Sequence, residues 1–186
     1  MAVNRTVDAI IVGGGGSGLA AAVSAAEQGC SVLLLEKQPQ LGGTTGIAVG
    51  SFTANRTAMQ QAAGIEDSLE DHAEDAGEFA PDSIEDRNNV ALRRWFLSHT
   101  AETLDWLRGM GLAFHGPNPE PPNRVPRMHN VVPNAKAYIA RLQARLLQLG
   151  GEIRCQAAVK ELLRADGRVV GEGHLVADRG LVGLLG

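Results

Sequence analysis

The chain has 186 residues, enough for one or one and a half domains, and its 44% hydrophobic but only 4% aromatic content predicts an aliphatic core. A net charge of −4 excludes a general basic surface for nucleic acid or an anionic membrane. The two cysteines, Cys30 and Cys155, are far apart and in no metal or C-x-x-C spacing, so we expect buried thiols in a reducing compartment.

No apolar window reaches the length of a membrane span. The apolar run near the N-terminus is broken by four consecutive glycines, which does not fit a secretory signal. From these two features we expect a soluble, cytoplasmic protein.

The first recognisable unit is an apolar run, Ala9–Val12, that ends in glycines and is followed by an alanine-rich helical segment at 19–26. Read as G-x-G-x-x-G, the glycines are Gly13, Gly15 and Gly18. They would permit a tight turn, a close backbone approach to a pyrophosphate, and close helix–strand packing, respectively. The anion would bind at the positive end of the helix.

A second short strand, Ser31–Leu35, ends in Glu36, about twenty residues beyond the glycines, as in dinucleotide-binding units. A carboxylate there accepts a hydrogen bond from a ribose hydroxyl and repels a 2′-phosphate. The alternative is an ordinary βαβ unit with a surface glutamate.

The loop at 37–46 contains Gly42-Gly43, where a short helical turn can begin. A second close backbone approach, six residues after the acid, suits a cofactor that continues past the pyrophosphate. This spacing favours FAD over a nicotinamide dinucleotide.

Two segments, 12–22 and 35–43, together resemble the fumarate reductase/succinate dehydrogenase flavoprotein family, which includes ketosteroid dehydrogenase-like enzymes. The resemblance implies a Rossmann-like α/β fold, bound FAD, and hydride transfer between the flavin and a C–C bond beside a carbonyl or carboxylate. Residues 46–54 resemble the family's small-residue segment along the flavin, although Thr44 and Gly50-Ser51 depart from the usual pattern. The cofactor contacts expected on this basis are Gly13, Gly15, Gly16, Ser17, Gly18, Glu36, Lys37, Gly42, Gly43, Thr44, Thr45, Gly50 and Val159.

Residues 56–110 show helical spacing of apolar residues. We interpret Trp95 and Trp106 as core anchors of helices rather than stacking platforms. The acidic run from Glu66 to Asp75 has no metal-ligand spacing and is expected to be a solvated helical face.

Residues 113–133 are rich in proline and are expected to form a loop. Its cationic groups, Arg124, Arg127 and His129, could meet a carboxylate substrate. The family has a comparable Arg-x-His segment, which implies positions beside the substrate for Arg127 and His129. The alternative is a loop that forms ion pairs within its own domain.

The segment 134–150 is an amphipathic helix with Asn134 as N-cap, and a strand follows at 152–155. A hairpin is expected from 159–164 and 168–172 around Asp166-Gly167. In the family, the backbone near Val159 contacts adenine. The whole pattern predicts a mostly parallel sheet with a helical insertion and a β-hairpin.

The resemblance covers about residues 7–172. We therefore assign 1–172 to an FAD-binding domain with an insertion at 50–133, and 173–186 to an atypical tail. The family continues into a second glycine motif and a capping domain with the catalytic acid, so we expect a truncated oxidoreductase with no assignable catalytic residue.

Two other functions remain open. A nicotinamide dehydrogenase lacks support, since no Tyr-x-x-x-Lys pattern follows the βαβ unit. A non-catalytic nucleotide-binding module, or an inert fragment, is the other. The expected partner of a complete enzyme is a small carboxylate or ketone.

Overall fold

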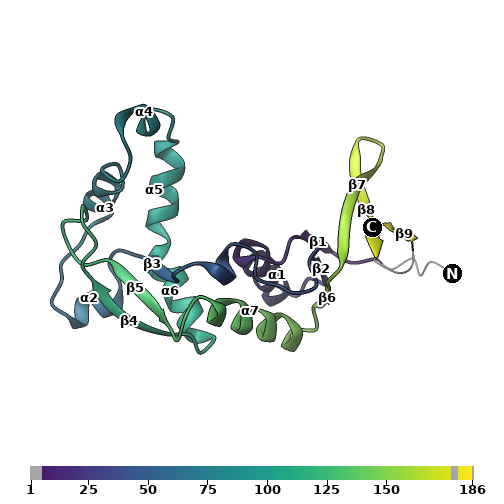
Figure 1. Ribbon diagram of the computed structural model, residues 1–186, viewed down its shortest axis with the longest axis horizontal. Coiled ribbons are helices and arrows are strands. Elements are labelled where there is room, and N and C mark those ends of the chain that lie inside the picture. Colours follow the sequence, from purple (N-terminus) through teal and green to yellow (C-terminus); the bar gives the residue numbers. More distant parts are fainter. Residues whose placement is uncertain (1–5, 177–179, 186) are drawn as a thin grey trace. The chain divides into compact units, whose positions relative to one another are not determined.

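The computed structural model describes residues 6–176 and 180–185, with side chains described up to residue 171. The chain divides into two compact units (Figure 1): Met1–Ala48 with Tyr138–Gly186, and Val49–Ala137. The FAD-binding domain expected at 1–172, with its insertion at 50–133, stays a prediction. Among the described residues, no helix is both long and apolar enough to cross a bilayer.

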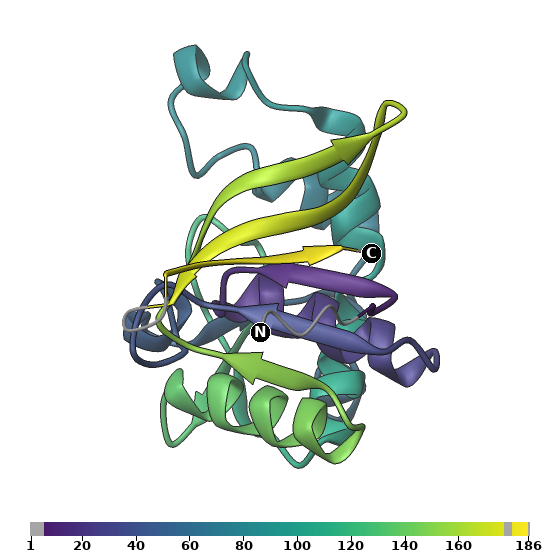
Figure 2. The ribbon, with the colours of Figure 1, turned by 90° about the vertical axis from the view of Figure 1, so that its right-hand side faces the viewer.

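The first unit is built on a parallel sheet of three strands in the order β1-β2-β6, which Figure 2 shows side by side. These strands are β1 (Ala9–Val12), β2 (Val32–Leu35) and β6 (Glu152–Arg154). Helix α1 (Gly16–Glu27) connects β1 to β2, and α7 (Lys136–Gln148) precedes β6. All four residues of β2 are buried, as expected for a central strand of a parallel sheet. The α/β fold predicted from the sequence is confirmed.

Helix α1 packs tightly because its inward residues are small or aliphatic. Leu19, Ala22 and Val23 are fully buried. Gly18 lies so close to β1 that an added Cβ would be 1.9 Å from the carbonyl oxygen of Gly13. Glycine is therefore obligatory at this position.

The expected hairpin is present as β7 (Ala157–Ala165) and β8 (Arg168–Val176), paired antiparallel. Asp166 and Gly167 both have positive φ angles, 49° and 76°, which is typical of the tight turns in hairpins. Strand β9 (Gly180–Leu185) pairs with β8, so these three strands form a sheet of their own. This backbone pairing covers most of the atypical tail, whereas residues 177–179 and 186 lie outside the described residues.

The second unit combines short helices with an antiparallel sheet in the order β3-β5-β4. A short 3₁₀ turn in the first unit, η1 (Thr45–Ile47), comes just before it in the chain, as expected after the paired glycines. The elements of the unit are β3 (Ser51–Thr53), α2 (Ala58–Ala62), α3 (Leu69–Asp75), α4 (Asp82–Glu85), α5 (Val90–Ser98), α6 (Thr100–Gly109), β4 (Ala113–Asn118) and β5 (Met128–Val132).

The expectation that residues 113–133 form only a loop is wrong, because β4 and β5 occupy both ends of this range. Their ladder shifts register between His115 and Asn118. Gly116 and Pro117 lie at this irregularity, where the missing N–H of proline does not interrupt the ladder. The prolines therefore led to the prediction of a loop, although the strand accommodates Pro117.

The expectation that Trp95 is a core anchor is also wrong. Its side chain is 62% exposed, and its ring centroid lies 4.7 Å from that of His99. Leu92 and Phe96 on the same face of α5 are also exposed, whereas Leu97 points inward. Apolar spacing identified the helix but not the side that packs. Trp106, on α6, is partly buried.

Candidate functional site

Two glycine-rich segments of the first unit meet beside the carboxyl end of β1. Gly15 and Gly42 form an isolated parallel bridge, and the Gly42 N–H donates to the carbonyl of Gly14 at 2.9 Å. An added Cβ on Gly43 would lie 3.3 Å from the Cα of Gly15. Gly42 and Gly43 have φ angles of 143° and 50°, so side chains are disfavoured there on both grounds.

The turn from β1 into α1 has the features assigned to each glycine of the motif. Gly13 has a φ of 103° at the turn, and Gly18 packs on β1. Gly15 is the N-cap of α1 and offers no side-chain cap, so the first backbone N–H groups of the helix have no intrahelical acceptors. Ser17 is exposed on this first turn. Such a helix end favours an anion.

Glu36 lies directly beneath the turn and is 7% exposed. Its Oε2 accepts from the Gly14 N–H at 2.7 Å, and its Oε1 accepts from the Gln38 N–H at 2.8 Å. Each carboxylate oxygen has a second lone pair, so acceptance from a ribose hydroxyl remains possible. Burial, together with the nearby Glu36 carboxylate, raises the pKa of the Cys155 thiol. Lys37, the next residue, is exposed.

The start of β7 is held against the same strand end. The Ala157 N–H donates to the Glu36 carbonyl at 2.9 Å, and Val159 packs against a cluster of Leu33, Leu35 and Ala157. Glu36 and Val159, expected from the sequence to contact the ribose and the adenine, therefore belong to one packed region.

The remaining expected cofactor contacts differ in their surroundings. Thr44 is exposed, whereas Thr45 is partly buried and its Oγ1 accepts from the Gly16 N–H at 3.2 Å. Gly50 belongs to the second unit, where an added Cβ would lie 2.8 Å from Cγ1 of Val131. Packing within that unit already explains a glycine at 50, and cofactor contact there stays a prediction.

These surroundings fit FAD. Bare backbone at Gly15 and Gly43 leaves room for a pyrophosphate, the α1 terminus favours its charge, and Glu36 is an acceptor at the position for a ribose. The individual contacts remain predictions, because they rest on the arrangement of the protein alone.

Arg127, in the second unit, is fully buried between two carboxylates, Asp67 and Asp75. Its Nη2 lies 2.6 Å from Oδ1 of Asp67. Burial raises the pKa of Asp75, but hydrogen bonds from Arg124 and Arg127 outweigh this effect and lower it to about 2. Arg124 bridges to Asp71, Glu74 and Asp75. These contacts are those of a loop that forms ion pairs within its own domain.

His129 is fully buried beside this cluster. Its Nδ1 lies 2.7 Å from the Arg127 carbonyl oxygen, and its Nε2 lies 3.0 Å from Oγ1 of Thr57. Since a carbonyl only accepts, Nδ1 carries the proton and Nε2 accepts from the threonine hydroxyl. Burial lowers the pKa of His129 and favours this neutral form. A place beside the substrate stays a prediction for Arg127 and His129.

The acidic run is not the solvated face expected from the sequence, because Asp67 and Asp75 are buried partners of Arg127. Isolated buried carboxylates are costly, and the ion pairs allow the run to turn inward. Glu70 and Glu74 do remain exposed. Within the described residues, no group of acidic, histidine or cysteine side chains could hold a metal ion.

Sequence reasoning missed a buried polar network around Asn55. Its Nδ2 donates to the Leu97 carbonyl at 2.9 Å and lies 2.8 Å from Nδ1 of His72. Thr57 and Gln60 form a capping box at the start of α2. The T-x-x-Q spacing of that box was a readable signal.

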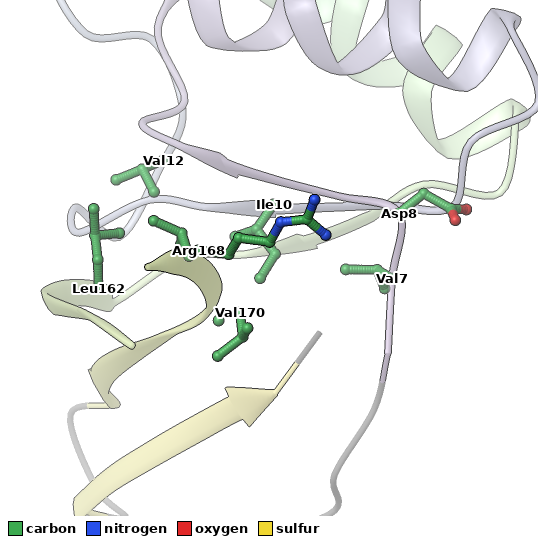
Figure 3. A pocket seen from close by; sticks show the side chains of 9 residues that line it. Val7, Asp8, Ile10, Val12, Leu162, Arg168 and Val170 are labelled. Carbon is green, nitrogen blue, oxygen red and sulfur yellow. The ribbon is translucent and has the colours of Figure 1, made fainter. Parts of the chain in front are cut away.

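A separate pocket of about 390 Å³ lies in the first unit between β1 and the β7–β8 hairpin (Figure 3). Its lining is mostly aliphatic and includes Ile10, Val12, Leu162 and Val170, with Arg168 among them. None of the expected cofactor residues lines it.

Comparison with known proteins identifies the family. Residues 8–174 match the family described as FAD binding domain. A fumarate reductase (cytochrome) of Shewanella frigidimarina is 38% identical over 110 residues, covering 59% of this chain and 19% of that protein. A urocanate reductase of Eggerthella lenta is 48% identical over 69 residues, covering 37% of this chain and 11% of that protein.

A solved flavocytochrome c3 fumarate reductase superposes with a TM-score of 0.87 at 26% identity, covering 97% of this chain and 32% of that one. The chain thus spans about a third or less of the length of these relatives. It belongs to the FAD binding domain family, as a flavoprotein related to the fumarate reductases, with FAD as its cofactor.

Proposed function

We propose that this chain is the FAD-binding part of an oxidoreductase that transfers a hydride between the flavin and a C–C bond adjacent to a carbonyl or carboxylate. The observation that supports this most directly is the meeting of Gly15 with Gly42 and Gly43 beside Glu36. Two of the relatives are named as reductases of fumarate and urocanate, which are both α,β-unsaturated carboxylic acids.

In this proposal the residues of the chain bind and orient the cofactor. Backbone N–H groups at the start of α1 receive the pyrophosphate, and Glu36 accepts from a ribose hydroxyl. The flavin supplies the hydride chemistry when bound. Lys37, Thr44 and the backbone at Val159 complete the set of proposed contacts.

No side chain in the described part of the chain is assigned as the catalytic acid. Arg127 is committed to two carboxylates, and both ring nitrogens of His129 have partners. Holding a substrate in the correct position beside the groups that react with it lowers the barrier by roughly 7–11 kcal/mol. A chain without side chains that bind and protonate the substrate is therefore a poor catalyst. We therefore propose that these 186 residues bind FAD without efficient turnover.

The test has two steps. Cofactor released from the purified protein by denaturation is identified by chromatography, and FAD is expected; stoichiometric NAD without flavin would contradict the proposal. Next, the FAD-loaded chain is reduced anaerobically, and reoxidation by α,β-unsaturated acids and ketones is followed. Substrate-dependent reoxidation at roughly 1 per second or faster would show that the acid lies within this chain.

An FAD-binding module without catalysis is the second candidate. It is favoured because Arg127 and His129 are buried and bonded to partners within their own unit. The second step separates the two. Slow reoxidation that depends on substrate identity supports a weakened oxidoreductase, whereas reoxidation indifferent to substrate supports a binding module.

A further inference from the structure

Helix α1 begins without a cap from its own N-cap residue. The N-cap is Gly15, which has no side chain to accept from the first turn. Helices usually satisfy such N–H groups with a Ser, Thr, Asp or Asn at the N-cap itself. In α1 the first helical N–H group, that of Gly16, has an acceptor from elsewhere in the chain.

The acceptor is Thr45, 29 residues later, whose Oγ1 lies 3.2 Å from the Gly16 nitrogen. Thr45 is the first residue of η1, immediately after the loop that carries Gly42 and Gly43. Its side chain approaches so closely that an added Cβ on Gly16 would lie 2.6 Å from Oγ1 and 3.0 Å from Cγ2 of Thr45. Gly16 and Thr45 are therefore complementary, because the absence of a side chain at 16 admits the threonine.

We infer that Thr45 is a positioning residue that caps α1 and fixes the 42–46 loop against the first glycine turn before the cofactor arrives. This inference rests on the proposed function, in which both segments bind FAD. The bridge at Gly42 and the Thr45 cap hold the loop at two points three positions apart. A loop already held in its binding conformation loses less entropy when the ligand binds.

In this inference Thr45 acts through Gly16 and the loop. Its hydroxyl keeps a proton to donate, so the direct cofactor contact expected from the sequence stays a prediction. Its neighbour Thr44 is exposed and follows the same glycines, so it provides a matched control for the Gly16 exchange measurement. As a proposed FAD contact, Thr44 is not a control for the affinity measurement. Thr45→Val keeps the shape of the side chain and removes the acceptor. Thr45→Ser keeps the hydroxyl, and Thr44→Val makes the same change one residue away.

The first measurement uses the full chain without cofactor and follows hydrogen exchange of the Gly16 amide by NMR. Loss of a helix cap predicts exchange roughly 2- to 30-fold faster in Thr45→Val, with little change in Thr45→Ser or Thr44→Val. Unchanged exchange at Gly16 in Thr45→Val would overturn the capping role.

The second measurement is FAD affinity, by quenching of flavin fluorescence. Thr45→Val is expected to weaken binding within the same roughly 2- to 30-fold range, and Thr45→Ser to restore it. Weakened binding with unchanged Gly16 exchange would make Thr45 a direct ligand and refute the inference. Faster exchange with unchanged affinity would also refute positioning of the cofactor loop. If the parent chain binds no FAD, the proposed function fails, and Gly16 exchange still decides the capping role.

Discussion

Replacing Gly15 by alanine separates cofactor binding from folding. Gly15 has φ −80° and ψ −176°, extended backbone that any residue adopts. An added Cβ would lie 3.9 Å from the Gly42 carbonyl oxygen, an ordinary contact. Alanine is a poorer N-cap than glycine, so we expect Gly15→Ala to lower the free energy of unfolding by only about 1 kcal/mol.

FAD binding should suffer far more. The methyl group would occupy the bare surface proposed for the pyrophosphate. Loss of one or two charge-assisted hydrogen bonds, at about 1.5–3 kcal/mol each, corresponds to at least a tenfold weaker affinity. Flavin fluorescence titration measures this change, and urea unfolding without cofactor measures stability.

Gly18→Ala is the matched comparison, because its added Cβ would lie 1.9 Å from the Gly13 carbonyl oxygen. We expect this variant to be strongly destabilised before any cofactor is added. Unchanged FAD affinity in Gly15→Ala would refute the glycine turn as the phosphate site. Parent-like stability of Gly18→Ala would refute the packing of α1 on β1.

Two further predictions concern the second unit. Arg127→Met should lower its stability by about 3–5 kcal/mol, since Asp67 and Asp75 would be left buried without a cation. The exposed ion pair of Arg94 with Glu70 serves as control, and Arg94→Met should lower the free energy of unfolding by at most about 1 kcal/mol. Urea titration measures both variants, and equal losses of stability would contradict the effect of burial. Burial lowers the pKa of His72 from 6.5 to about 4, so its contribution to stability is present above pH 6.5 and lost as the pH falls toward 4. The free energy of unfolding, measured by urea titration, should therefore decline as the pH falls through this range, with a slope of up to about 1.4 kcal/mol per pH unit for the one proton. The decline should be less steep in His72→Gln, and identical slopes would exclude His72 as the titrating group.

The sequence predicted the first unit well because its signals are local. The turn at Gly13, the packing of Gly18 and the strand ending in Glu36 follow from neighbouring residues and a repeated spacing. The turn at Asp166-Gly167 is equally local. Each of these features needs only a few consecutive residues to specify it.

The second unit was harder to predict because distant partners determine it. Asp67 and Arg127 are 60 positions apart, and nothing in the acidic run indicates that it turns inward to meet a cation. Pro117 suggests a loop until the register shift against β5 is known. The outward face of Trp95 likewise depends on which side of α5 finds a neighbour. Tertiary packing determines these ion pairs, the strand register and the buried face of the helix.

Both tryptophans of the chain, Trp95 and Trp106, belong to the Val49–Ala137 unit, whereas Glu36 and the paired glycines belong to the other. Indole emission consequently reports on one unit, and release of FAD bound as proposed through Glu36 and the paired glycines, followed by flavin fluorescence, reports on the other. Recording both signals along one denaturant titration distinguishes a single cooperative transition from two. Separate midpoints would mean that each unit holds its structure by itself.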